Sequence, residues 1–232
     1  MFHSEDYMRQ LIDLLKGSFH DRLCYVGLQG SYMRGEATED SDIDPMVVID
    51  RLTVADLDSY KQIISHMECP EKSCGFICGK QDLMCWNPLE ICHLLHTTKD
   101  YYGKLAELVP TYTDDDVRNF VRLSVNNLYH EITHRYIHGS PDENAARIAS
   151  SYKGVFFILQ NVHYLETGVF VQGKAELLER LEDEDREILT VAIAVGNGES
   201  FDFDTIFSVL HIWCRNVLKR LANWGNKDEV QN

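Results

Sequence analysis

Residues 30–44 read GSYMRGEATEDSDID, and this stretch decides the fold of the first half of the chain. It joins two apolar runs rich in strand formers, at residues 23–28 and 45–49. We therefore expect a buried strand that stops at Gly30, a brief helical segment through Arg34, a polar loop, and a second strand over residues 43–49. The order of these elements places polar side chains between two strands of one sheet.

The carboxylates at the start of the second strand form a candidate metal site. Asp42 and Asp44 are two residues apart, and so both side chains leave the same face of a strand. Carboxylate oxygens are ligands that suit Mg²⁺, which also keeps waters and substrate phosphate oxygens in its shell. Gly30 lets the backbone approach a ligand closely, and the helix start at Ser31 offers free N–H groups to phosphate. The pattern predicts metal-dependent chemistry on a nucleoside triphosphate.

Over residues 23–49 the sequence resembles the DNA polymerase β-like nucleotidyltransferase superfamily. The resemblance implies that Gly30 and Ser31 hold the nucleotide phosphates and that Asp42 and Asp44 bind Mg²⁺. It implies a role for Arg34 as well, as a brace of the loop or as a ligand contact. The positions that match the motif are Gly30, Ser31, Arg34, Gly35, Ser41, Asp42 and Asp44.

The superfamily usually adds a third carboxylate from the next strand, as a metal ligand or as a general base. The expected next strand, residues 73–79, contains no acid. Asp82 follows it closely and is our candidate catalytic acid, with Glu68 and Glu71 as alternatives. Without a third carboxylate, the metal or the substrate must activate the acceptor, and the rate is then modest.

The organisation of the chain changes near residue 110. Before it, strand and helix patterns alternate, whereas after it the apolar residues recur at spacings of three and four. Helices are expected to start at residues 113–116 and at 140–143, and two more over residues 175–194 and 203–222. We predict an α+β fold: a small mixed β-sheet nucleotidyltransferase domain with flanking helices over residues 1–110, and an all-α helical bundle domain over residues 111–232.

The helical half carries a second resemblance. Residues 164–168 read YLETG and are followed by Lys174, which is similar to a segment of the streptomycin and spectinomycin adenylyltransferases. In those enzymes a lysine of the second domain reaches the nucleotide phosphates. The resemblance implies that role for Lys174, with Lys153 as the other candidate; a lysine suits phosphate as a compact cation. Those enzymes also use a glutamate base in the third strand, and this chain has no equivalent acid there.

The composition of the chain indicates which classes of binding partner to expect. The chain has 232 residues and a formal net charge of −15, which repels a nucleic acid backbone and favours small or cationic partners. Seven cysteines and no cationic-apolar leader indicate free thiols and a cytoplasmic location. No apolar run reaches the roughly 18 residues of a membrane helix, and so no membrane partner is expected. The oligomeric state stays open.

One rival motif lies in the helical half. Residues 130–134 read HEITH, the H-E-x-x-H pattern in which two histidines bind zinc and Glu131 activates water. The sequence that follows lacks the glycine of the extended metzincin form. Ten histidines in the chain also make a chance match easy. We therefore favour histidines on a polar helix face, some of them near an acceptor pocket.

These observations predict a Mg²⁺-dependent enzyme that moves AMP from ATP to a hydroxyl of a small molecule and releases pyrophosphate. A polycationic acceptor such as an aminoglycoside fits the acidic chain, which would make it an antibiotic-resistance enzyme. Two alternatives stay open. The acceptor is a protein side chain, as in adenylylating antitoxins of the superfamily, or the fold persists as a non-catalytic nucleotide sensor.

Overall fold

The computed structural model describes residues 2–224, except for the side chains of residues 141 and 142. The chain divides into two compact units, Met1–Tyr112 and Thr113–Asn232, and each is described by itself. Residues 1 and 225–232, at the ends of the two predicted domains, lie outside the described residues. The first unit combines a sheet with helices and the second contains helices, which confirms the predicted α+β fold class.

The first unit is built on a four-stranded mixed sheet with the order β3-β2-β1-β4. Strand β1 pairs antiparallel with both β2 and β4, whereas β2 and β3 run parallel. The predicted strands at residues 23–28 and 43–49 are both present, although Ile43 forms only an isolated bridge before β2 begins. The strands are β1 (Leu23–Gln29), β2 (Asp44–Ile49), β3 (Phe76–Gly79) and β4 (Lys99–Tyr102).

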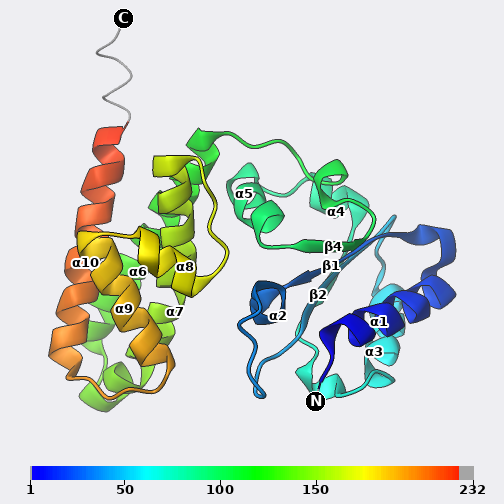
Figure 1. Ribbon diagram of the computed structural model, residues 1–232, viewed down its shortest axis with the longest axis horizontal. Coiled ribbons are helices and arrows are strands. Elements are labelled where there is room, and N and C mark those ends of the chain that lie inside the picture. Colours follow the sequence, from blue (N-terminus) through cyan, green and yellow to red (C-terminus); the bar gives the residue numbers. More distant parts are fainter. Residues whose placement is uncertain (1, 225–232) are drawn as a thin grey trace, which may run out of the picture. The chain divides into compact units, whose positions relative to one another are not determined.

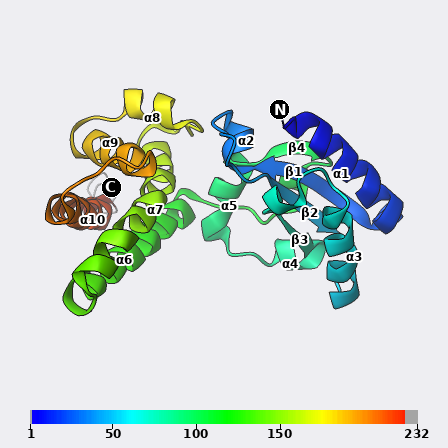
Figure 2. The ribbon, with the colours of Figure 1, turned by 90° about the horizontal axis from the view of Figure 1, so that it is seen from below.

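Helices cover both faces of this sheet (Figures 1 and 2). Helices α1 (Ser4–Phe19) and α3 (Val54–Ser65) pack on one face, and α4 (Lys80–Met84) and α5 (Pro88–His96) on the other. Helix α2 (Gly30–Arg34) lies between β1 and β2 in the chain. Short 3₁₀ turns occupy His20–Arg22, Pro70–Lys72 and Leu105–Glu107.

Alternation along β2 explains why both faces are covered. Val47 and Ile49 are fully buried under α1 and α3, while Met46 and Val48 are fully buried on the opposite face. Each such side chain contributes about 1.5–3 kcal/mol when it is removed from water. Because Asp44 is two residues from Met46, its side chain leaves the strand on the face that α4 and α5 cover.

The second unit is a helical bundle. Its helices are α6 (Asp114–His138), α7 (Pro141–Thr167), α8 (Lys174–Arg180), α9 (Asp183–Gly196) and α10 (Phe203–Trp224). The core contains two large buried side chains that form hydrogen bonds between helices. Trp213 donates its indole N–H to Asp185 at 2.7 Å, and Tyr152 donates its hydroxyl to the Ile206 carbonyl at 2.7 Å.

The prediction of a single helix over residues 175–194 is wrong in one respect. The chain breaks it into α8 and α9, because Leu181 and Glu182 adopt extended backbone conformations and Asp183 has a φ of 44°. No glycine or proline marks this break in the sequence. As for the lipid bilayer, none of the helices within residues 2–224 has the length and apolar character needed to cross it.

Candidate active site

Gly30 forms the corner of the site. Strand β1 ends at Gln29, and Gly30 begins α2 with a φ of +70°, a conformation that favours glycine. A Cβ atom at this position would lie 1.9 Å from Oδ2 of Asp44. Strand pairing brings this carboxylate to the corner, because Asp44 is the register partner of Gln29. The glycine therefore makes room for an aspartate of the neighbouring strand.

Asp42 and Asp44 flank Ile43 and share one side of the chain. Ile43 has no exposed surface and packs into the core under α1 and α3. Its backbone bonds to the segment that leads into β3: its N–H donates to the Lys72 carbonyl at 2.8 Å, and its carbonyl accepts from the Cys74 N–H at 2.9 Å. Because neighbouring residues of an extended chain alternate, both aspartates leave the face opposite Ile43.

The electrostatics of the pair favour a bound cation. Burial raises the pKa of Asp44, the negative charge of Asp42 raises it further, and Arg34 opposes these effects. The two carboxylates thus repel each other, and the charge of Arg34 offsets this repulsion only in part. A divalent cation would relieve this repulsion, and oxygen donors of this kind fit Mg²⁺.

The aspartates supply only part of a metal shell. Among residues 2–224, no group of three or more His, Cys, Asp or Glu side chains is placed to hold a metal ion. Mg²⁺ commonly binds through one or two carboxylates together with substrate phosphates and water. The protein therefore fits a cation that arrives with, or is completed by, a phosphate ligand.

Arg34 braces the loop that carries the motif. Its side chain is 9% exposed, and Nε donates to Glu36 Oε2 at 2.9 Å. The backbone N–H of Glu36 donates in turn to the Ser31 carbonyl at 2.9 Å. At the far end of the loop, Ser41 Oγ accepts the N–H of Thr38 at 2.8 Å. These contacts fix the loop between the glycine corner and the aspartates.

Asp82 lies at the other end of the sheet, which corrects the expectation that it joins Asp42 and Asp44. Strands β2 and β3 run parallel, with Met46 beside Phe76 and Ile49 beside Gly79. Asp44 begins β2, whereas Asp82 follows the end of β3. Its Oδ2 accepts the N–H of Gly79 at 3.2 Å, and so it caps α4.

The position beside Asp44 on the third strand belongs to a cysteine. The bridge between Ile43 and Ser73 and the register of β3 place Cys74 next to Asp44, on the same face. The Cys74 side chain is exposed. Glu68 and Glu71 are exposed as well, and both precede the bridge. No acid therefore occupies the third-strand position next to Asp44.

His93 is a residue near the site that sequence reasoning missed. It belongs to α5, on the same sheet face as Asp44. Thr98, which follows α5, accepts a 2.9 Å hydrogen bond from Gln29 of β1 and donates to the Leu94 carbonyl of α5 at 2.6 Å. Burial, together with the positive charges of Arg34 and His96, lowers the pKa of His93 to about 4. The imidazole is therefore neutral near pH 7. No local pattern in the sequence marks it.

The two candidate phosphate lysines both lie in the second unit. Lys153 is an exposed residue of α7. Lys174 is the first residue of α8, and its Nζ lies 5.7 Å from the centroid of the Phe156 ring. Their contact with nucleotide stays a prediction.

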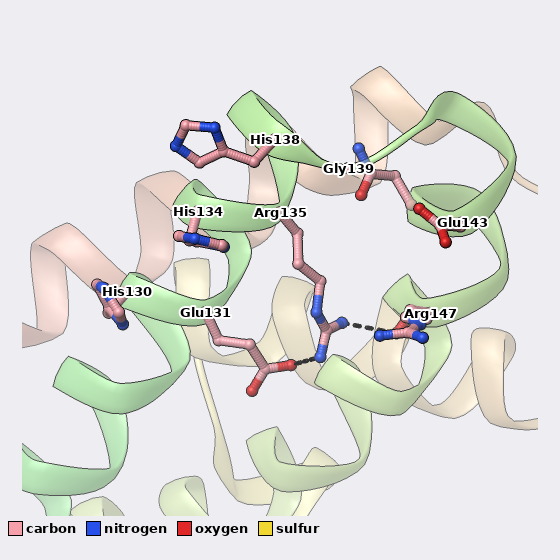
Figure 3. Close-up of a pocket in the computed structure, with 9 residues that line it drawn as sticks. His130, Glu131, His134, Arg135, His138, Gly139, Glu143 and Arg147 are labelled. Carbon is pink, nitrogen blue, oxygen red and sulfur yellow. Dashed lines mark hydrogen bonds and ion pairs between the residues drawn. The ribbon is translucent and has the colours of Figure 1, made fainter.

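The H-E-x-x-H motif does not have the features of a zinc peptidase site (Figure 3). His130, His134 and His138 occupy successive turns of α6, beside a cavity of about 460 Å³. Glu131, which would have to activate water, instead forms an ion pair with Arg135 and accepts the Ser151 hydroxyl at 3.3 Å. The glutamate is thus already engaged as a structural partner.

Comparison with known proteins agrees with this geometry. Residues 20–69, which contain the glycine corner and both aspartates, match the family model described as nucleotidyltransferase domain. The match confirms, over these residues, the expected resemblance to nucleotidyltransferases. No curated protein sequence matches the chain significantly.

Solved structures extend the likeness to the fold of the whole chain. Spectinomycin adenyltransferase from Enterococcus faecialis, crystallised with ATP and spectinomycin, is similar with a TM-score of 0.57 at 18% identity. The match covers 94% of this chain and 99% of that one. A toxin–antitoxin structure with AMP-PNP matches 56% of this chain and 93% of that chain at 20% identity, with a TM-score of only 0.33.

Proposed function

We propose that this protein transfers AMP from ATP to a hydroxyl group of a small molecule. The acceptor oxygen attacks the α-phosphorus, the bond from that phosphorus to the β-phosphate oxygen breaks, and pyrophosphate leaves; the hydroxyl proton is released. The observation that carries the proposal is the Asp44 carboxylate held against Gly30, with the charge of Asp42 beside it. Such a pair at the start of a strand serves phosphoryl chemistry when a cation and a triphosphate complete it.

Each residue of the corner has a separate task in this proposal. Asp42 and Asp44 hold Mg²⁺, while Gly30 and Ser31 receive the nucleotide phosphates. Arg34 keeps the loop in place through Glu36. When bound, Mg²⁺ offsets the negative charge of the phosphates and of the departing pyrophosphate. Lys174 or Lys153 adds a cationic contact from the helical unit.

The missing third acid sets an expectation for the rate. Cys74 stands beside Asp44 where a base would serve the acceptor. A positioned general base contributes about 10²–10⁴-fold to catalysis. Transfer by the natural chain is therefore slow, unless the acceptor brings its own basic group.

The acidic balance of the chain supports a cationic acceptor. A net charge of −15 attracts amines and repels polyanions. The structurally similar spectinomycin adenyltransferase was crystallised with an aminocyclitol antibiotic as well as ATP. We accordingly propose an amine-bearing polyol of the aminoglycoside type as the acceptor, and antibiotic modification as the activity.

The test uses ATP labelled at one phosphate at a time. Purified protein is incubated with Mg²⁺, a panel of aminoglycosides including spectinomycin and streptomycin, and ATP labelled at the α- or the γ-phosphate. The α-label is expected on the antibiotic and the γ-label in pyrophosphate. With cell lysate in place of the panel, α-label on a protein band would instead favour the protein-adenylylating alternative.

A nucleotide sensor is the second candidate, and Cys74 in place of an acid is the observation that favours it. A sensor binds ATP and Mg²⁺ without turnover. Calorimetry with ATP and Mg²⁺, run beside the transfer assay, separates the two functions. Heat of binding without label transfer to any acceptor would contradict the enzymatic proposal.

A further inference from the structure

Helix α7 fixes the backbone of the segment that leads to Lys174. Residues 168–173 join α7 to α8, and Lys174 begins α8. Gln160, which lies in α7 and has no exposed surface, donates its Nε2 to two consecutive carbonyls of this segment. The distances are 2.8 Å to the Val171 oxygen and 3.1 Å to the Gln172 oxygen. One side chain thus anchors the segment just before the lysine.

The same helix also holds the ammonium group. Nζ of Lys174 lies 5.7 Å from the centroid of the Phe156 ring. This distance is within the range in which a cation is attracted to an aromatic face. Phe156 precedes Gln160 by four residues, and so the two side chains lie on one face of α7. One face of α7 therefore contacts both the backbone that leads to Lys174 and its ammonium group.

The burial of Gln160 is informative about its role. Its Oε1 atom is buried and has no hydrogen-bond partner among the described residues. A buried acceptor without a partner costs free energy, and an apolar side chain of similar size would avoid that cost. The amide is therefore useful for its two donated hydrogen bonds rather than for packing. Both bonds act on the segment before Lys174.

We infer that Gln160 and Phe156 are positioning residues that hold Lys174 in the conformation in which it meets the nucleotide phosphates. The inference rests on the proposed function through the role given to Lys174. A free lysine side chain loses conformational entropy when it binds phosphate, and a lysine held in place beforehand loses less. Removal of either restraint weakens ATP binding without removing the charge.

A double-mutant cycle in the full-length protein tests this. ATP affinity in the presence of Mg²⁺ is measured by calorimetry for the wild type, Gln160→Met, Lys174→Ala and the double variant. Loss of a charge-assisted contact in Lys174→Ala is expected to weaken binding by about 10-fold or more. Gln160→Met is expected to weaken it by about 3- to 10-fold, and the double variant to bind no more weakly than Lys174→Ala. Additive effects would overturn the inference.

Tyr152→Phe is the matched control for stability. It removes another buried hydrogen bond of α7, the 2.7 Å bond to the Ile206 carbonyl, which does not involve the segment before Lys174. Its thermal stability is expected to fall while its ATP affinity stays at the wild-type value. An equal loss of affinity in Tyr152→Phe and Gln160→Met would overturn the positioning role, because both would then act through bundle stability.

Phe156→Leu gives the second route if Gln160→Met does not fold. It keeps an apolar side chain and removes the ring beneath the ammonium. The loss of ATP affinity is expected to disappear in the Lys174→Ala background, and additivity would again overturn the inference. Unchanged affinity in Lys174→Ala would reject the role of the lysine and this inference with it. The proposed transfer function would not be rejected by that result, because variants of Asp44 test it separately.

Discussion

Strand β2 has an aspartate at each end, and the two ends differ in how charge is balanced. At its start, Asp44 is next to Asp42, and burial and the neighbouring charge raise its pKa. After its end, Asp50 accepts a 3.0 Å ion pair from Arg22, which lowers its pKa. The surroundings therefore disfavour the ionised form of the aspartate at the start of the strand and favour the ionised form of the aspartate after its end.

At the end of β2, the carboxylates near Arg22 are paired with hydrogen-bond donors. Arg22 also bonds to both carboxylate oxygens of Asp56, at 2.9 and 3.0 Å, and donates to the Arg51 carbonyl at 2.5 Å. Asp56 additionally accepts the N–H and hydroxyl of Thr53 as part of the α3 capping box. At the start of β2, by contrast, the nearby Arg34 bonds to Glu36. A carboxylate pair whose charges are only partly balanced is a candidate functional site, whereas the fully paired carboxylates at the other end have a structural role.

The largest difference between the two ends should appear in transfer activity. Asp44→Asn is expected to lower the rate of pyrophosphate release by about 10³-fold, because it removes the carboxylate that we propose to hold the cation. Asp50→Asn, at the compensated end, is expected to change the rate by no more than about twofold. Near-normal turnover in Asp44→Asn, measured as initial rates with saturating ATP, would remove the distinction between the ends.

An acid beside Asp44 should sharpen the comparison. Cys74→Glu places a carboxylate next to Asp44, just before β3. There it can serve as the general base that takes the proton from the attacking hydroxyl group. We expect the turnover number to rise by about 10-fold or more. Cys85→Glu is the matched control, since Cys85 is also exposed in the first unit but follows α4. A rise in both variants would indicate a general effect of charge rather than a base at the site.

The smallest expected effect concerns stability, where the two ends should have opposite signs. Asp44→Asn removes a disfavoured charge and is expected to raise the free energy of unfolding by about 1 kcal/mol at pH 7. Asp56→Asn removes a carboxylate whose pKa Arg22 lowers, and so the variant is expected to be less stable than the wild type. Thermal unfolding of both variants at pH 7 measures the two signs.

The pH dependence of these stabilities follows from the two shifts. A lowered pKa means that Asp56 stabilises the fold above its ordinary value of 3.8, and that this contribution is lost as the pH falls below that value. A raised pKa means that ionised Asp44 destabilises the fold, and that the cost is relieved as the pH falls through the raised value. The stability deficit of Asp56→Asn should therefore shrink in acid. A deficit that is constant down to pH 3 would contradict the ion-pair explanation.

The sequence predicted those elements whose causes are local. The capping boxes at Thr113 and Ser140 start helices where their spacing indicates. The strands around residues 30–44 follow from apolar runs, and strand spacing places Asp42 and Asp44 on one face. The approach of Asp44 to Gly30 depends on the pairing of β1 with β2. Strand β4 was missed, because its first two residues are exposed and it exists through pairing with β1.

Errors at the site came from information that no local pattern contains. Asp82 was predicted beside the aspartates because it follows the third strand closely, but the parallel direction of β3 carries it to the opposite end. His93 reaches the surroundings of Arg34 only through the packing of α5 on the sheet. Chain direction and tertiary packing decided both positions.

The contact between Gly30 and Asp44 has a consequence for how ligands enter. Oδ2 of Asp44 is screened by main chain on the glycine side, since even a methyl group there would overlap it. This oxygen is therefore closed to a ligand on the side of residue 30. A competitive inhibitor aimed at this corner would have to extend away from residue 30, and enlarging it toward residue 30 would weaken its binding.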